Sequence, residues 1–188
     1  MKRGIFVLVI LLIICMNRTN AQTVGGLRIG YSYYTATVSG SGLSNVINSS
    51  GFEWGLTSYS TLKNNFYLNY SFTLGYLGSF NTFGIPLYLG LKIPVNNSNF
   101  SFFGQAGAYL EYWNLSSSNT DLKKWINPWQ PGLALMGGIS IKKFKIEVSY
   151  KYGLTNLASI NEEEYNGVYY GNSSLKLSSL SLGISYVF

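Results

Sequence analysis

The sequence predicts an all-β fold, a closed up-and-down barrel of eight antiparallel strands. Two observations predict it: bulky apolar residues alternate with small or polar residues in eight segments, and the connections between these segments alternate between short and long. A period of two places successive side chains on opposite faces of a strand. The last segment shows the pattern most clearly, because serine or glycine separates Leu180, Leu182, Ile184 and Tyr186 before Phe188.

Residues 1–21 have the layout of a secretory signal peptide, which places the barrel domain at residues 22–188. Lys2 and Arg3 precede an apolar run over residues 4–16, and polar residues then lead to Ala21. The apolar run is shorter than the roughly 20 residues of a membrane-spanning helix, so cleavage is favoured over anchoring. The only cysteine, Cys15, lies in this run, so we expect no disulfide in the mature chain.

The predicted strands follow in order along the chain, at residues 27–34, 52–57, 66–76, 85–93, 101–112, 133–141, 146–152 and 180–188. In each of them, one face is rich in Leu, Ile, Phe, Trp or Tyr and the other in Gly, Ser, Thr, Ala or Asn. Strand 66–76 is the most regular, because it alternates without interruption from Phe66 to Tyr76. A change in the parity of the apolar residues predicts a β-bulge near Ser178 and Ser179.

The connections form two classes. Residues 63–65, 94–99 and 142–144 read as short turns, whereas residues 39–50, 77–84, 114–130 and 155–173 read as longer polar loops. Short turns at one end and longer loops at the other are typical of a transmembrane barrel whose two termini lie in the periplasm.

Alternation alone does not say which face is outside. A soluble lipocalin-like barrel would turn its bulky face inward around a ligand. An eight-stranded barrel has room inside only for packed side chains, which suits the small face better. Charged residues make up only 11% of the chain, too few for a wall in water. The sequence therefore predicts a bulky face in lipid. Aromatic residues near both strand ends would form the interfacial girdles: Tyr33, Trp54, Tyr76, Tyr112, Trp113 and Tyr152 at the loop end, and Phe66, Phe100, Tyr186 and Phe188 at the turn end.

With a signal peptide ending at Ala21, eight alternating strands and the terminal Tyr186-Val187-Phe188, the chain resembles the small outer-membrane β-barrel family of Gram-negative bacteria, the PorT-like and OmpA-like transmembrane barrels. The resemblance implies an outer-membrane location with periplasmic termini and extracellular long loops. It also implies that Tyr186 and Phe188 are the assembly signal read by the barrel-assembly machinery. Members of this family include structural proteins, adhesins, small pores and secretion accessories.

Several function classes are disfavoured by composition. The chain has no histidine, the usual base of hydrolytic sites, so we expect no enzyme, no cofactor and no metal site. Loss of Lys2, Arg3 and Arg18 with the signal peptide would halve the net charge of +6, and no basic stripe indicates a nucleic-acid partner. The acidic run at residues 162–164 reads as a solvated loop tip rather than a cation site.

Charged residues on the small face are the main candidates for a mechanism. Strand direction places one group (Arg28, Lys92 and Glu147) in the periplasmic half of the lumen and a second (Glu53, Glu111 and Lys151) in the outer half. Because a buried charge must be paired, we expect two ion-pair clusters that plug the barrel together with Tyr34, Tyr67, Tyr88 and Tyr109. A narrow porin-like pore with selective charges is the alternative.

Aromatic residues of the predicted long loops could act as binding anchors: Trp125, Trp129, Tyr165, Tyr169 and Tyr170. They could equally pack on the barrel rim or lie among lipid headgroups. The expected function is therefore a non-enzymatic outer-membrane barrel with an envelope-structural or surface-interaction role, whose partners are lipid and a surface ligand or envelope protein. A secretion-system accessory barrel is a further alternative.

Overall fold

Eight long strands and one short hairpin make up the described part of the chain. The computed structural model describes residues 23–40, 45–78, 80–96, 98–115, 127–160, 163–165, 168–170 and 173–188, so the predicted signal peptide lies outside it. No helix among these residues is long and apolar enough to cross a membrane. The strands are β1 (Thr23–Gly40), β2 (Asn45–Thr61), β3 (Phe66–Leu77), β4 (Phe80–Pro94), β5 (Phe100–Leu115), β6 (Trp129–Ile141), β7 (Phe144–Ile160), β8 (Glu163–Tyr165), β9 (Val168–Tyr170) and β10 (Ser173–Val187).

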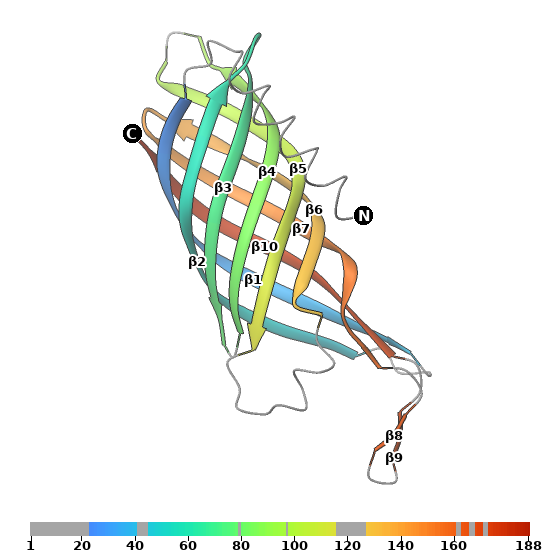
Figure 1. Cartoon of the computed structure of the whole chain (residues 1–188). Helices are drawn as coiled ribbons and strands as arrows, with labels where there is room; N and C mark the ends of the chain where they lie inside the picture. The colour runs from blue at the N-terminus through green and yellow to red at the C-terminus, as the bar shows by residue number, and fades with distance from the viewer. Residues whose placement is uncertain are drawn as a thin grey trace.

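The long strands form a closed antiparallel barrel in the order β1-β10-β7-β6-β5-β4-β3-β2. Closure comes from β1, which pairs with β2 on one side and with β10 on the other. The strands are tilted against the barrel axis, and β8 and β9 form a separate two-stranded sheet beyond one end (Figure 1). This architecture confirms the predicted fold class.

The two ends of the barrel are named here by their connections. The turn side holds the β2–β3, β4–β5 and β6–β7 connections together with Thr23 and Val187, and the loop side is the opposite end, at the bottom of Figure 1. Strand lengths of 12 to 18 residues exceed the about 9 to 11 that a tilted spanning strand needs, so the strands extend beyond a bilayer core.

The bulky face of every long strand points outward. Ile29, Phe52 and Leu135 are 63, 69 and 61% exposed, whereas the inward Ser32 and Ser185 are completely buried. This arrangement follows from side-chain volume, because an eight-stranded barrel closes around a narrow interior that small residues can fill. The described barrel is therefore apolar outside and polar inside.

The prediction of a long loop is wrong for two of the four segments. Instead of loops at residues 39–50 and 77–84, β1 continues to Gly40, β2 begins at Asn45, and only residues 78–79 separate β3 from β4. The ladder persists because polar residues still pair there, as Gly75 does with Thr82. Gly78 closes the turn at a φ of 59°, a left-handed conformation that glycine adopts without steric cost. The long connections are those at residues 116–128 and 161–172.

The predicted bulge lies close to its expected place. The β10–β7 register shifts between Leu175 and Lys176 and again between Lys176 and Ser178. The extra residues at these shifts lie on β7, between Tyr152 and Ala158, whereas Leu177 on β10 keeps the inward parity of Ser179 and Ser181 and is buried.

Candidate functional site: the barrel lumen

Five charged side chains form one continuous ion-pair network inside the barrel. Arg28 on β1 pairs with Glu147 on β7 and with Glu53 on β2, where Arg28 Nη1 and Glu53 Oε2 are 3.0 Å apart. Lys151 on β7 pairs with Glu53 at 3.3 Å and with Glu111 on β5 at 2.5 Å. All five are buried. The two clusters expected from the sequence are joined because Glu53 contacts both cations.

Neutral donors complete the partners of the three carboxylates. The Tyr34 hydroxyl donates to Glu53 at 2.6 Å, Trp113 Nε1 to Glu111 at 3.3 Å, and the Ser185 hydroxyl to Glu147 at 3.4 Å. Each carboxylate therefore has at least two partners, as a buried charge requires. With two cations and three carboxylates, the network carries a net negative charge.

Small residues on the neighbouring strands make room for these side chains. Glu147 lies in register between Gly183 and Gly138. A Cβ atom on Gly183 would lie 3.2 Å from the Arg28 guanidinium and 3.3 Å from Glu147 Cγ. The glycines thus decide where a long charged side chain can lie across the barrel.

The four tyrosines expected in the plug are all buried inside the barrel. The ring of Tyr67 occupies the place that a Cβ atom of Gly90 would take, and the ring of Tyr109 does the same over Gly132. Both glycines are the direct cross-strand partners of these tyrosines. Tyrosine rings laid over glycines fill the lumen between the ion pairs.

An apolar cluster closes the loop side of the lumen, and it is called here the loop-side cap. Trp113 lies edge-on to Tyr34, with ring centroids 5.2 Å apart, and to Phe80, at 5.5 Å. The prediction that Trp113 belongs to the outer girdle is wrong, because Tyr112 faces outward and adjacent residues of a strand face opposite ways. The cap consists of Tyr34, Ala36, Leu77, Trp113, Leu157 and Leu177, with Phe80 and Leu175 packed against it.

The turn side is less completely filled. The ammonium group of Lys145 lies 3.2 Å from the ring centroid of Tyr59 and 5.2 Å from those of Tyr67 and Phe103. A cavity of about 280 Å³ adjoins these groups and is called here the mouth pocket. Lys145 was not among the lumen residues predicted from the sequence, although its position two residues before the inward Glu147 indicates that it faces the lumen.

The predicted lumen residue Lys92 lies apart from the network. It is exposed near the end of β4 and lines the mouth pocket together with Lys142 and Lys145. Its position follows from its place close to the turn, where the inward face of the strand opens to the barrel mouth. The other five predicted lumen charges are those of the network.

The two residues expected to form the assembly signal lie on the outer wall at the turn side. The Tyr186 ring packs against Phe144 and Phe188, with centroids 5.1 and 5.9 Å apart. The backbone amide of Phe188 donates to the Gly25 carbonyl at 2.9 Å, which ties the end of the chain to β1. Their role in assembly stays a prediction.

The predicted loop aromatics divide into three groups. Trp129 is the first residue of β6 and packs on the outward ring of Tyr112, with centroids 5.0 Å apart, so it belongs to the barrel wall. Trp125 lies outside the described residues. The backbones of three tyrosines belong to the β8–β9 hairpin: Tyr165, Tyr169 and Tyr170.

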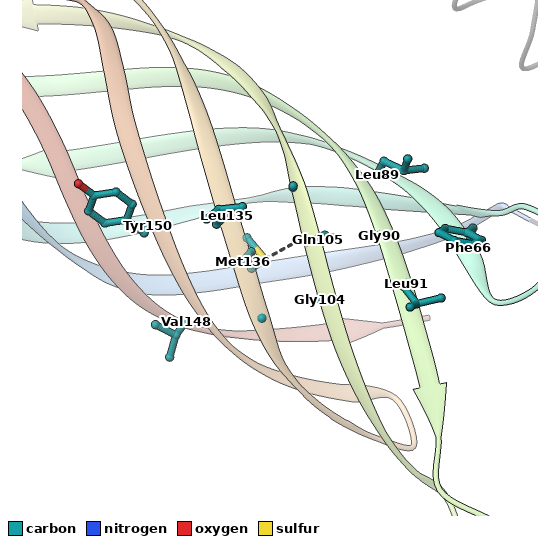
Figure 2. A pocket seen from close by; sticks show the side chains of 12 residues that line it. Phe66, Leu89, Gly90, Leu91, Gly104, Gln105, Leu135, Met136, Val148 and Tyr150 are labelled. Atoms are coloured by element: carbon teal, nitrogen blue, oxygen red, sulfur yellow. Dashed lines mark hydrogen bonds between the residues drawn. The ribbon is translucent and has the colours of Figure 1, made fainter.

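A hollow of about 580 Å³ indents the outer wall across β4 to β7. Figure 2 shows Gly104 between the larger outward side chains Leu91 and Leu135. Behind this hollow, Gln105 Nε2 donates to Met136 Sδ at 2.6 Å on the lumen side. The hollow is a step in the apolar wall, formed where Gly104 pairs with Gly137.

Among the described residues, no group of three His, Cys, Asp or Glu side chains is placed to hold a metal ion. The described part of the barrel instead offers three features for function: a polar lumen filled by side chains, an apolar outer wall and a cationic mouth pocket.

Comparisons with known proteins extend over most of the chain. No family model and no curated protein matches the sequence. Among solved structures, Neisserial surface protein A is similar with a TM-score of 0.48 and 13% identity, over 86% of this chain and 97% of that one. Ail, the attachment invasion locus protein of Yersinia pestis, gives 0.41 and 19%, over 87% and 99%. The outer membrane enzyme PagL gives 0.45 and 11%, over 82% and 97%.

Proposed function

We propose that the chain is an integral outer-membrane barrel of a Gram-negative bacterium, closed in its lumen and without catalytic activity. The main observation that supports this proposal is the outer wall of the barrel. Large apolar side chains from all eight long strands are exposed there, a continuous belt far larger than the apolar patches of water-soluble proteins. Such a belt is stable only in contact with lipid.

Lysines mark the two borders of this belt. At the turn side Lys143 lies over the ring of Tyr186, with Nζ 5.9 Å from the centroid, and at the loop side Lys176 lies over Tyr152 at 4.6 Å. Between these borders, the described strands present no charged side chain outward. The length of β7 between the Lys143 border and the Lys176 border matches the about 9 to 11 residues of a membrane-spanning strand. Lysine stems on apolar walls with ammonium groups at the interface are typical of a membrane boundary.

The filled lumen supports a closed barrel rather than a pore. The ion-pair network crosses the interior between β1, β2, β5 and β7, and the space beside it measures about 10 Å³, the size of one water molecule at most. Below and above it lie the buried tyrosines and the loop-side cap. These described groups leave little room for a solute, which supports the closed lumen.

Single-channel recording in planar bilayers tests the closed lumen. Pure refolded protein should give no conductance steps. Reproducible steps whose size or ion selectivity changes in Lys151→Ala would overturn the closed lumen, because they would place ions beside the network.

For the biological role, the β8–β9 hairpin supports a surface interaction. It pairs only with itself, beyond the barrel rim at the loop side (Figure 1). An isolated two-stranded hairpin is at best marginally stable in water, so a contact with another molecule would stabilise it. Its sequence contains three tyrosines and two glutamates, residue types that suit such a contact.

Surface labelling tests both the orientation and the accessibility of the hairpin. A peptide epitope is inserted between residues 166 and 167, and intact cells are stained with antibody. We expect staining of intact cells. The matched control carries the same epitope between residues 96 and 97 on the turn side, and it should stain only after the outer membrane is permeabilised. Staining of the control alone would reverse the orientation.

A further inference from the structure

The mouth pocket brings three lysines together without a carboxylate. Lys92 from β4, Lys142 from the β6–β7 turn and Lys145 from β7 line one cavity. Among the described residues, none of the three forms an ion pair, and every described ion pair belongs to the network deeper in the lumen. Lys92 lies near enough to Lys145 for their like charges to repel, so an anion that binds between them relieves that repulsion.

A buried hydroxyl group adds a second, independent observation. Tyr67 lines the same pocket, and its hydroxyl is buried without a hydrogen-bond partner. A buried polar group that lacks a partner is uncommon in a folded protein and costs about 1–3 kcal/mol. The hydroxyl has less than 1 Å² of accessible surface, so an acceptor atom of a bound ligand would satisfy it once the Tyr67 ring turns toward the pocket.

The walls and the volume limit the ligand. The aromatic rings of Tyr59, Tyr67 and Phe103 surround the Lys145 ammonium group, so the inner part of the pocket is flat-walled and apolar. A volume of about 280 Å³ lies at the lower end of the range for small-molecule sites, about 300–1,000 Å³. It excludes long oligosaccharides and accepts one anionic group with a compact substituent.

From these features we propose that the mouth pocket binds a phosphate group. Lysine ammonium groups bind phosphate as point charges, and the several oxygens of phosphate can accept from more than one of the pocket lysines at once. Two sources share this chemistry: a free phosphate monoester, and the headgroup of an anionic phospholipid in the adjacent leaflet. The outward Phe66 at the pocket edge places lipid within reach of the second source.

Nuclear magnetic resonance on ¹⁵N-labelled refolded barrel tests this proposal. The protein is held in phosphate-free maltoside micelles and titrated with phenyl phosphate and with inorganic phosphate, or it is compared in nanodiscs of phosphatidylglycerol and of phosphatidylcholine. We expect saturable shifts of the amide signals of Tyr59, Tyr67 and Lys145. Shifts with the soluble probes identify a free phosphate ligand, and shifts in phosphatidylglycerol nanodiscs alone identify a lipid headgroup.

Variants separate a site from general attraction of anions. Lys145→Met keeps the aliphatic stem and should weaken binding at least tenfold, whereas Lys63→Met removes a turn-side lysine outside the pocket and should leave it unchanged. If Lys145→Met fails to fold, Lys92→Met and Lys142→Met at the rim replace it. No saturable shift under any condition, or equal binding by all variants, would overturn the site. That result would leave the closed membrane barrel unaffected.

Discussion

The loop side and the turn side of the lumen are built by different means. At the loop side the loop-side cap packs inside the barrel, and beneath it every charge of the network has a partner of opposite sign. At the turn side the Lys145 ammonium group lies against aromatic rings and forms no ion pair among the described residues, and an open cavity of about 280 Å³ adjoins it. The same strands therefore form a sealed, paired end and an open, cationic end. This contrast indicates that stability is concentrated toward the loop side and that binding capacity is left at the turn side.

Removing a cation from each end gives the largest expected difference. Lys151→Met leaves three buried carboxylates facing Arg28 alone, so we expect the free energy of unfolding to fall by about 3–5 kcal/mol. Lys145→Met removes contacts to aromatic rings but also removes a buried charge that Lys92 repels, so the expected loss is smaller, about 1 kcal/mol or less. Urea unfolding in lipid vesicles, followed by tryptophan fluorescence, measures both. Adding Glu111→Gln to Lys151→Met should restore part of the stability, and equal losses for the two lysines would contradict the contrast.

A methyl group placed under a tyrosine compares the same two ends by packing. Gly132→Ala collides with the Tyr109 ring in the sealed part, and we expect a loss of about 1–3 kcal/mol. Gly90→Ala collides with Tyr67, but the mouth pocket gives that ring space to move, so the loss should be smaller. The control is Gly104→Ala, where a Cβ atom meets nothing within 4 Å and stability should stay the same or rise slightly. A greater loss for Gly90→Ala than for Gly132→Ala would show that the turn side is packed as tightly.

The two lysine borders of the apolar belt should show the smallest difference in the free energy of unfolding. Lys143→Ala and Lys176→Ala each remove one ammonium group over an interfacial tyrosine, and we expect each to lower the free energy of unfolding by about 0.5–1 kcal/mol. Lys63→Ala, which contacts no aromatic ring among the described residues, should change it by less. The same urea series decides the order, and an equal loss for Lys63→Ala would remove the role assigned to the two borders.

The outer wall could be predicted from the sequence because a strict period of two leaves only two faces, and lumen volume decides between them. The ends of the strands could not be predicted in the same way. Beyond the lipid-facing stretch, the residues of β2 before Gly51 do not alternate, because Val46 and Ile47 are adjacent and the rest are Asn or Ser, so no pattern signals a strand there even though the ladder with β1 continues. Pairing with β1 still satisfies the backbone hydrogen bonds there, but the pattern of apolar side chains does not indicate this pairing.

The sequence predicts which residues face the lumen, but it does not predict which of them contact one another. Inward parity identifies Arg28, Glu53 and Lys151, yet which of them meet depends on the register between strands and on glycines such as Gly183 beside them. The loop-side cap was missed because Leu157 and Leu177 lie in segments that read as loop or bulge. The mouth pocket could not be predicted for the same reason: Lys92 is far in sequence from Lys142 and Lys145 and meets them only in the closed barrel.

Heat-modifiability of the protein in the outer-membrane fraction tests the central claim most directly. The fraction is run on a denaturing gel with and without boiling. A closed barrel whose apolar wall lies in lipid should migrate faster unboiled, and its faster band should be found in the outer-membrane fraction. A single band that does not change with boiling, recovered in the soluble periplasmic or secreted fraction, would contradict the membrane barrel.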